Sequence, residues 1–437
     1  MINLFDRNDQ ATWDLYFSLK AIGEEKPTII IQDDGWLPDN LESPWNYFLR
    51  EDCAGHPLFF NQIVVPDLWE IRGDNSSASI YDYDRRAGEI VYANPKNKRW
   101  VKEVKWFDYT GKVRSIDYYN CFGWRFAQET INLAGQSVIK TYYTQTGKEK
   151  IVENLLTGDI ILNTNEKILN FMSRTDFIYY YLCQRGFQLD CIRYNSLSYP
   201  FFISLKRQTV QKDLLFWQEP LGQTMPGNMK LIFNGQAKQT KRIIFFERDS
   251  YENAKKISGN KLDINFGGYI YQYKRKNSYG KNGLILTNSD QLEKIEVLIK
   301  RLPEMDFKIA AVTEMSDKLE QLRYYKNVTL YPNITQQQLN DLWYKCDFYL
   351  DINHQGELQN AIRTAFDYNL LVVGFENTAH NRHFTAKDKL FQPQHVSTMI
   401  EELKRCLKDP IYMQKQLEHQ AETANQATLN QYRQLLE

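Results

Sequence analysis

Polar side chains that could bind a ligand follow several short apolar segments in the C-terminal part of the chain. Together they supply hydrogen-bond donors and acceptors without an obvious nucleophile. They are Asn288 and Ser289, Glu314, Asn333, and the run Asn353, His354 and Gln355. Such groups suit a ligand rich in hydroxyl or amide groups, such as a carbohydrate or a polar peptide. The same residue types also cap helices and form turns, so each residue alone has an equally good structural explanation.

Asp33 and Asp34 form a second candidate group near the N-terminus. They follow the apolar segment Ile29–Ile31 directly. Their carboxylates could accept hydrogen bonds from the hydroxyl groups of a ligand, or they could cap the next turn. The sequence leaves both alternatives open.

The sequence contains no pattern typical of a metal or cofactor site. His380 and His383 lack the helical spacing of a metal-binding pair, and none of the six cysteines forms a CxxC pair. A P-loop and a GxGxxG fingerprint are also missing. We therefore expect no metal, no cofactor and no catalytic residues of these classes, and reduced thiols.

The C-terminal candidates require a scaffold that brings strand ends together. Apolar segments at 282–287, 307–312, 328–331, 347–352 and 370–375 alternate with helical patterns. Two of these helices have candidate capping boxes, Asp290 with Glu293 and Thr335 with Gln338. This alternation predicts a parallel, doubly wound sheet over residues 282–437. Ligands bind beyond the carboxyl ends of the strands in such sheets.

The N-terminal part gives a weaker signal of the same kind. A helix over 11–22 precedes a strand over 28–31, and the pattern resumes with a helix over 167–185 and strands over 201–205 and 242–246. We predict a discontinuous Rossmann-like domain made of residues 1–57 and 163–260. Residues 261–281 are rich in Gly, Asn, Lys and Tyr and are predicted to form the linker.

Residues 58–162 follow a different, period-two pattern. Five glycines, Gly88, Gly111, Gly135, Gly147 and Gly158, are spaced like hairpin turns. This predicts an antiparallel β-meander inserted in the first domain. Its aromatic residues exceed what a core needs, and Tyr and Trp favour interfaces. The partner-binding candidates are Tyr81, Tyr83, Trp100, Trp106, Tyr109 and Tyr118.

The composition excludes several classes of protein. Lys plus Arg and Asp plus Glu are both 54, so the net charge is zero and a nucleic-acid-binding role is not expected. Charged residues interrupt the first segment, and no apolar run is long enough to span a bilayer. We expect a cytoplasmic protein, with peripheral contact at the cytoplasmic face of the membrane left open.

The layout resembles a glycosyltransferase with two facing Rossmann-like domains, the GT-B architecture. More narrowly, it resembles the GtfB family of glycosyltransferase-stabilising proteins of the accessory Sec system. The resemblance rests on "MINLFD", "PTIIIQDDGW", the β insertion and "DFYLDINHQGELQNAIRTAFDYNLLVVGFENT". It implies a related catalytic partner, GtfA, that transfers N-acetylglucosamine from UDP-GlcNAc to Ser and Thr of serine-rich repeat adhesins before their export.

The resemblance also allows a test of activity. Retaining enzymes of this architecture carry E-x7-E, in which the first Glu lies by the donor sugar and the second binds the ribose. Gln355 and Arg363 occupy these two places, and Asn288 and Ser289 replace a Gly-Arg that binds the diphosphate. Lys294 stands where the family's second cation would lie. Arg has no acceptor for ribose hydroxyls. A shift of the alignment onto Glu357 would restore one Glu but lose its partner.

We therefore expect a non-catalytic subunit that binds a Ser/Thr-rich acceptor in an inter-domain cleft and holds the catalytic partner through its β insertion. Two alternatives stay open at this point. One is an enzyme that itself transfers a sugar from a nucleotide donor. The other is an independent carbohydrate-binding module with no enzyme partner.

Overall fold

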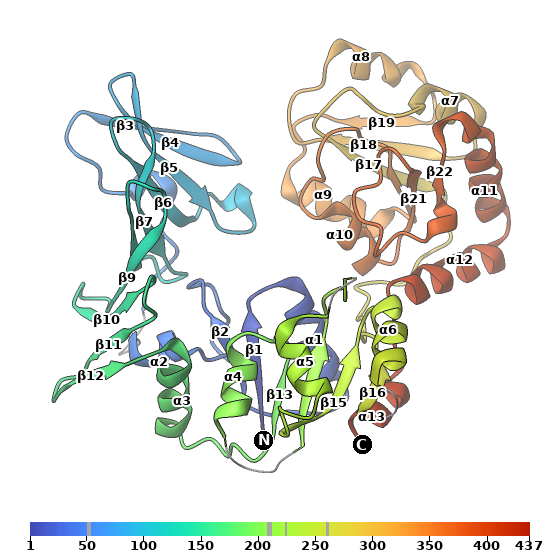
Figure 1. The fold of residues 1–437 in the computed structure, drawn as a ribbon. Coiled ribbons are helices and arrows are strands. Elements are labelled where there is room, and N and C mark those ends of the chain that lie inside the picture. The colour runs from blue at the N-terminus through green and yellow to red at the C-terminus, as the bar shows by residue number, and fades with distance from the viewer. Residues whose placement is uncertain (50–53, 208–211, 223–224, 259–261) are drawn as a thin grey trace. The chain divides into compact units, whose positions relative to one another are not determined.

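The structure is a computed structural model and describes residues 1–49, 54–207, 212–222, 225–258 and 262–437. The chain divides into two compact units, Met1–Phe266 and Gly267–Glu437. Each unit contains a six-stranded parallel sheet, and the first also contains a ten-stranded antiparallel sheet (Figure 1). These sheets have the α/β architecture that the alternating pattern predicts.

The parallel sheet of the first unit has the strand order β16-β15-β14-β13-β1-β2. Its strands are β1 (Ile2–Arg7), β2 (Thr28–Gln32), β13 (Ile192–Tyr194), β14 (Asp213–Trp217), β15 (Thr240–Phe245) and β16 (Asp263–Phe266). The helices of this unit are α1 (Gln10–Ala21), α2 (Pro44–Leu49), α3 (Arg174–Gln184), α4 (Tyr199–Lys206), α5 (Gly227–Phe233) and α6 (Arg248–Ser258). Most of these strands are buried apolar runs, as expected where helices cover both faces of a parallel sheet.

Several sequence predictions for the first unit were wrong. The predicted strand 201–205 belongs to helix α4, where Pro200 in the first turn favours a helix start. The predicted helix 167–185 is helical only from Arg174, because Ile168–Phe171 forms strand β12. Strand β16 lies in the predicted linker, where it pairs with β15. Strand β1 was not predicted, although it lies between β13 and β2.

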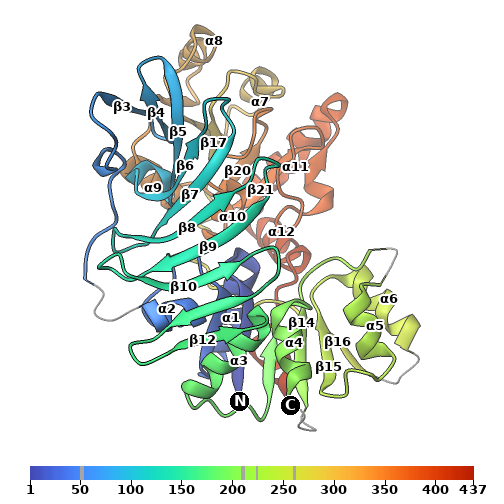
Figure 2. The same cartoon turned by 60° about the vertical axis from the view of Figure 1, so that its left-hand side comes forward.

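The antiparallel sheet pairs its ten strands in chain order from β3 to β12 (Figure 2). The strands are β3 (Trp69–Gly73), β4 (Ser77–Asp82), β5 (Arg85–Tyr92), β6 (Val101–Phe107), β7 (Val113–Tyr119), β8 (Arg125–Ile131), β9 (Ser137–Tyr143), β10 (Glu149–Asn154), β11 (Ile160–Asn163) and β12 (Ile168–Phe171). This confirms the predicted meander.

Four of the five predicted turn glycines lie in turns. Gly111, Gly135, Gly147 and Gly158 have φ between +79° and +85°, a conformation that costs glycine little. The prediction for Gly88 was wrong, because it lies within β5 and pairs with Trp106. A Cβ at Gly88 would come within 2.9 Å of the Lys105 carbonyl oxygen, so close strand approach rather than a turn favours glycine there.

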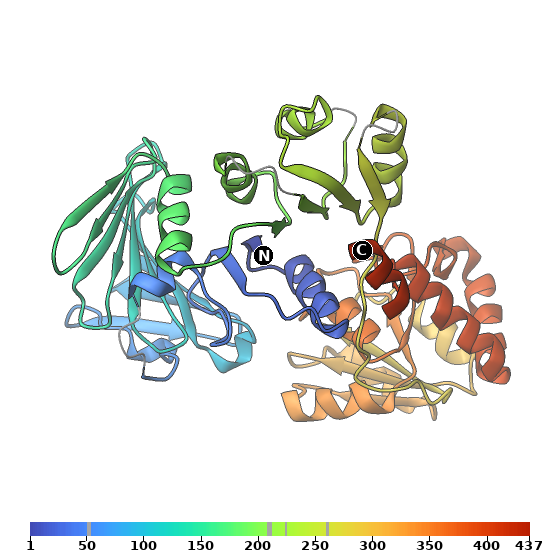
Figure 3. The same ribbon diagram turned by 90° about the horizontal axis from the view of Figure 1, so that it is seen from below.

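One tryptophan joins the antiparallel sheet to the parallel sheet of the same unit. Trp45 of α2 stacks on Tyr142 of β9 with ring centroids 4.5 Å apart, and on Phe177 of α3 at 4.9 Å. Its indole N–H donates to the Ile31 carbonyl of β2 at 2.9 Å. Helix α3 lies along one face of the antiparallel sheet (Figure 3). The two sheets therefore share one hydrophobic core.

The second unit has the strand order β19-β18-β17-β20-β21-β22. Its strands are β17 (Asn282–Thr287), β18 (Asp306–Ala311), β19 (Val328–Tyr331), β20 (Phe348–Asp351), β21 (Leu371–Phe375) and β22 (Leu390–Phe391). Its helices are α7 (Ile295–Arg301), α8 (Asp317–Glu320), α9 (Gln336–Lys345), α10 (Ala361–Asp367), α11 (Val396–Lys408), α12 (Pro410–Thr423) and α13 (Leu429–Leu436). The five predicted strands are confirmed within one or two residues at their ends.

The two predicted capping boxes had different outcomes. Thr335 and Gln338 form the predicted box at the start of α9. The box predicted for Asp290 and Glu293 was wrong, because α7 begins only at Ile295, after Lys294 with φ +53°. Glu293 is thereby left outside the helix, at the carboxyl edge of the sheet.

In the part of the chain that the structure describes, no helix combines the length and the hydrophobicity needed to span a bilayer.

The Trp45 contacts lead to a prediction about stability. The Trp45→Ala variant is expected to lower the free energy of unfolding by about 3–5 kcal/mol, because it leaves a cavity where three elements meet. Urea unfolding followed by far-UV circular dichroism measures this loss. The control Val64→Ala removes a side chain that is 91% exposed and is expected to change little. Equal effects of the two variants would contradict the assigned role of Trp45.

Candidate active site remnant and its surroundings

The carboxyl edge of the second parallel sheet carries most of the predicted polar residues. Thr287 ends β17, and its hydroxyl is 3.2 Å from Oδ1 of Asn353, which follows β20. Asn353 Nδ2 also donates to the Gln355 carbonyl at 3.3 Å and lies 3.5 Å from Asn288 Oδ1. Since β17 and β20 are parallel neighbours, their ends bring Asn288 and Asn353 together as predicted. Asn353 is 4% exposed, so its side chain mainly holds the two loops together.

Glu293 is the centre of a more accessible polar group. Its Oε2 is 2.8 Å from His354 Nε2 and accepts a hydrogen bond from Asn377 Nδ2 at 3.0 Å. Lys294 Nζ lies 3.7 Å from its Oε1. Although burial opposes ionisation, the hydrogen bonds from Asn377 and His354 lower the pKa of Glu293. We call Glu293, His354 and Asn377 the Glu293 cluster, which presents a carboxylate, an imidazole and an amide at one edge.

His380 is held by two acceptors next to this edge. Its Nδ1 is 2.5 Å from Asp351 Oδ1, and its Nε2 is 2.5 Å from the Gln355 carbonyl oxygen. A neutral imidazole donates through one nitrogen only, whereas the imidazolium donates through both. The hydrogen bond to Asp351 accordingly raises the pKa of His380, against the effect of burial. His380 therefore fixes the loop that carries His354 and Gln355.

Arg363 has structural partners. Its Nε donates to Asp367 Oδ1 at 2.8 Å, and its guanidinium lies 5.2 Å from the Tyr271 ring centre and 4.9 Å from that of Phe384. The side chain is 13% exposed. Glu357, the residue reached by shifting the alignment, accepts a hydrogen bond from the Ile362 amide at the start of α10. The position predicted to replace the ribose-binding Glu thus carries a packed cation.

The remaining predicted residues of this edge are exposed, except Ser289, which is half-buried. Gln355 and Glu314 lie in the loops after β20 and β18. Asn333 follows β19 with φ +47°, and its backbone N–H donates to the Thr313 carbonyl at 3.0 Å. Ser289 accepts from the Gln291 amide through its hydroxyl at 3.0 Å. Asn333 and Ser289 therefore also stabilise turns, as the structural alternative predicts.

Asp33 and Asp34 bind groups within the first unit. Asp33 accepts from the Gly35 amide at 2.8 Å and from the Ser43 hydroxyl at 2.6 Å. Asp34 accepts from Asn8 Nδ2 at 2.9 Å and from Lys102 Nζ of β6 at 2.7 Å. Asp33 thus stabilises the loop after β2, and Asp34 ties this loop to the antiparallel sheet.

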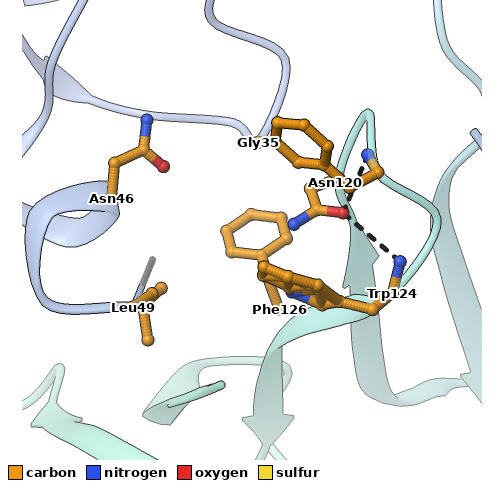
Figure 4. Close-up of a pocket in the computed structure, with 7 residues that line it drawn as sticks. Gly35, Asn46, Leu49, Asn120, Trp124 and Phe126 are labelled. Carbon is orange, nitrogen blue, oxygen red and sulfur yellow. Dashed lines mark hydrogen bonds between the residues drawn. The ribbon is translucent and has the colours of Figure 1, made fainter. Parts of the chain in front are cut away.

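A small hollow lies beside this loop (Figure 4). Gly35, Asn46, Leu49, Asn120, Phe122, Trp124 and Phe126 line it. Asn120 Oδ1 accepts hydrogen bonds from the Phe122 and Trp124 amides, which shapes the turn between β7 and β8. Gly35 has φ +83°, and a Cβ there would lie 2.6 Å from the Phe126 ring. The hollow is a consequence of this close approach and is too small for a sugar.

The six partner-binding candidates differ in accessibility. Tyr83 and Tyr109 are 72% and 89% exposed in turns of the antiparallel sheet. Tyr81 lies under the Arg72 guanidinium at 4.6 Å. The other three have partners inside the unit: Trp100 stacks on Trp36, the Trp106 N–H donates to Asp117 Oδ2, and the Tyr118 hydroxyl donates to Glu129 Oε2.

Within the described ranges, no group of three or more His, Cys, Asp or Glu side chains is arranged to hold a metal ion.

Comparison with known proteins places the chain in a family. Four models match consecutive parts: the GtfB N-terminal domain over residues 2–48, the GtfB middle domain over 69–172, the GtfB third domain over 174–257 and the GftB/GlyA-F C-terminal domain over 283–420. The UDP-N-acetylglucosamine–peptide N-acetylglucosaminyltransferase stabilizing protein GtfB of Streptococcus agalactiae is 40% identical over 439 residues, covering 100% of this chain and 99% of that protein. The chain belongs to the GtfB family.

Solved structures agree with this assignment. A chain in a crystal structure of a GtfA/B complex bound to UDP and GlcNAc is 41% identical, with a TM-score of 0.95 over 100% of this chain and 99% of that one. A TarM variant from S. aureus, 11% identical with a TM-score of 0.50, shares the fold alone. The predicted GT-B-like fold class is confirmed. The predicted family is also confirmed, and its named members are stabilising proteins rather than catalytic ones.

Sequence reasoning missed the most connected residues of the edge. Glu293 was assigned to a helix cap, and Asp351 was only the end of a strand. A signal was available for Asp351, since it is a carboxylate at the end of the buried segment Phe348–Asp351. Its partner His380 lies 29 residues further along the chain, so the pair could not be read from local spacing.

The His380 contacts lead to a prediction about pH. Because the pKa of His380 in the folded chain is raised above its ordinary value of 6.5, its stabilisation is complete below about pH 6.5 and is lost as the pH rises through the folded-state value. As the pH rises from about 6.5 through the folded-state pKa, the unfolding midpoint of the wild type should therefore fall more than that of His380→Gln. Imidazole NMR measures the pKa directly. The Asp351→Asn variant should move it back toward 6.5, and an unchanged value would contradict the assignment.

Proposed function

We propose that this protein is the non-catalytic, stabilising subunit of a complex that transfers N-acetylglucosamine to a polypeptide. Its partner is a related catalytic glycosyltransferase chain of the GtfA kind. The observation that carries this proposal is the full-length identity of about 40% to proteins named as stabilising such a transferase. The solved chain with a TM-score of 0.95 to this one is itself part of a GtfA/B complex.

The residues of the second unit support a donor site that does not bind a nucleotide sugar. Arg363 occupies the place of the carboxylate that accepts hydrogen bonds from ribose hydroxyls. Its guanidinium is bound to Asp367 and packed between two rings. Asn288 and Ser289 offer no cation to a diphosphate, and charge-assisted bonds are the strong ones. The alternative of an active, nucleotide-sugar-dependent transferase is therefore less well supported.

The acceptor is proposed to be a Ser/Thr-rich repeat adhesin, bound before its export by the accessory Sec system. Within the second unit, the Glu293 cluster is the best-placed group for hydroxyl-rich chains, because it combines an ionised carboxylate with an accessible imidazole and amide. Asn288, Ser289, Glu314, Asn333, Asn353, Gln355 and Arg363, and Asp33 and Asp34 in the first unit, stay proposals for this role. An extended, disordered acceptor binds weakly at one site and gains avidity through repetition.

The antiparallel sheet is proposed to hold the catalytic chain. Tyr83 and Tyr109 are the most exposed of the candidates. We also keep as proposals the domain division predicted from the sequence and a cytoplasmic location, with peripheral membrane contact left open.

The first test concerns the donor site. The isolated chain is expected to bind UDP-GlcNAc with a Kd of about 1 mM or weaker, because both charged contacts to the donor are missing. Isothermal titration calorimetry measures this, with the catalytic chain as the positive control. Micromolar binding with transfer by the isolated chain would favour the active enzyme instead. Sugar binding without any assembly would favour the independent carbohydrate-binding module.

The second test concerns the acceptor. Glu293→Gln keeps the side-chain shape but removes the negative charge of the carboxylate that contacts His354 and Asn377. Transfer to a Ser/Thr-rich peptide by the assembled complex is expected to fall about tenfold, as for a lost charge-assisted hydrogen bond. The control Glu296→Gln changes an exposed carboxylate on α7 and should leave transfer unchanged. Unaltered transfer by Glu293→Gln in an intact complex would remove the cluster from the acceptor site.

A further inference from the structure

The amino edge of the second parallel sheet, opposite the Glu293 cluster, is formed by the starts of β19, β18, β17, β20 and β21. The segment 274–281 runs along this edge, because Asn277 Nδ2 donates to the carbonyls of Asp347 and Asn369, which precede β20 and β21, at 3.0 and 2.8 Å. We call this part of the unit the basic edge. It consists of residues 274–281, 301–306, 324–327, 344–347 and 367–370.

The fully exposed charges of the basic edge are all positive. The acids in these described segments are buried or half-buried. Asp347 pairs with Arg275 at 2.6 Å, and Asp306 pairs with Lys281 at 3.4 Å. The exposed cations are Lys274, Lys276, Lys281, Arg301, Lys326 and Lys345.

The carboxyl edge of the same sheet has the opposite balance of charge. The segments that follow the same five strands are 288–294, 312–316, 332–335, 352–360 and 376–386. They contain two cations, Lys294 and Arg382, against five acids. These acids are Asp290, Glu293, Glu314, Glu357 and Glu376. Charge is therefore separated along the strands of this unit, although the chain as a whole is neutral.

Exposed tyrosines accompany the cations of the basic edge. Among the described residues of the second unit, five large hydrophobic side chains are exposed, and three of them are tyrosines at this edge. Tyr324 is 83% exposed, Tyr344 is 54% exposed and Tyr279 is 38% exposed. These side chains lie near the starts of β19, β20 and β17, so they are distributed along the edge.

Tyr279 is held in a costly backbone conformation. Its φ is +56°, a left-handed value that is rare for a bulky side chain and is adopted more easily by Gly or Asn. The neighbouring amides of Ser278 and Gly280 donate to the Asp347 carboxylate at 2.8 and 2.9 Å, which fixes this conformation. Strained residues that the surrounding structure holds in place often have a functional role.

Helix dipoles explain only part of the positive charge. Arg301 and Lys345 are the last residues of α7 and α9, where a cation interacts favourably with the helix C-terminus. Lys276 and Lys326 lie outside the helices, so this explanation does not apply to them.

The residue types of the basic edge suit a lipid surface better than a protein surface. Five of the six exposed cations are lysines, and lysine is depleted at protein interfaces. Tyrosine is enriched at the level of the lipid headgroups, and clustered lysines are attracted to anionic headgroups. Five strands at about 4.8 Å spacing extend over roughly 19 Å, so several headgroups can be contacted at once.

We propose that the basic edge binds the surface of an anionic phospholipid bilayer, with its tyrosines at the level of the headgroups. The acidic carboxyl edge then faces away from the bilayer, which leaves the Glu293 cluster in water. This inference specifies the membrane contact left open under the proposed function and rests on the cytoplasmic location proposed there. It does not depend on the transfer reaction.

The test is sedimentation of the full chain with vesicles at low ionic strength. The wild type is expected to bind vesicles of equal parts phosphatidylglycerol and phosphatidylcholine, but not vesicles of phosphatidylcholine alone. Lys276→Glu with Lys326→Glu should weaken binding at least about tenfold, because two attractive charges become repulsive. The control Lys318→Glu with Arg382→Glu makes the same change of net charge at exposed residues near the carboxyl edge and should bind nearly like the wild type. Tyr324→Ala keeps the charge and should also weaken binding.

Several outcomes would contradict this inference. Absence of wild-type binding to the anionic vesicles, or equal binding by the two double variants, would overturn it. Binding of immobilised polyglutamate through the same lysines, without binding of vesicles, would assign the basic edge to an acidic polypeptide instead. Unchanged binding by Tyr324→Ala would exclude the tyrosines from the contact.

A transfer assay separates this inference from the proposed function. The Lys276→Glu, Lys326→Glu variant, assembled with the catalytic chain, should still support transfer to a Ser/Thr-rich peptide. A wild-type complex that binds anionic vesicles but shows no transfer would overturn the proposed function and leave the lipid surface in place.

Discussion

The stacking of Trp45 against Tyr142 and Phe177 is the interaction on which the first unit depends. A ten-stranded antiparallel sheet has two large faces, and it must bury part of one of them to be stable. Here α2 and α3 supply that cover, while the Trp45 indole N–H is bonded to β2 of the parallel sheet. Arg174 of α3 pairs with the buried Glu153 of β10 at 2.5 Å, so the same boundary also contains a charged contact. The sheet is therefore a fixed extension of the Rossmann-like domain and can present its turns in defined positions.

The second unit gathers polar side chains at one edge of its parallel sheet. Parallel strands still deliver polar side chains to one edge, because that follows from topology rather than from the identity of the residues. Most of the charged side chains there are held by partners of their own. Arg363 is satisfied by Asp367 and by two rings, and His380 is satisfied by Asp351 and a backbone carbonyl. Glu293 differs from these two residues because it shares its charge with the partly exposed side chains of His354 and Asn377.

These two observations distinguish two surfaces of the chain. The second unit offers a polar edge around the Glu293 carboxylate, and the antiparallel sheet offers exposed aromatic side chains at Tyr83 and Tyr109. The proposed function needs two such surfaces, one for the catalytic partner and one for a hydroxyl-rich acceptor.

The sequence by itself determined the five long strands of the second sheet, the capping box of Thr335 and Gln338, the meander and four of its turn glycines. Each of these depends on neighbours within about a dozen residues. It misassigned Tyr199–Lys206, because a short apolar run is compatible with a strand or a helix and only packing against the sheet decides. It also placed Glu293 in a cap, whereas Leu292 bridges to Asn353 and the left-handed Lys294 precedes the helix. The Glu293 cluster and the pair of Asp351 with His380 join residues 29 to 84 positions apart, so only the tertiary structure could decide them.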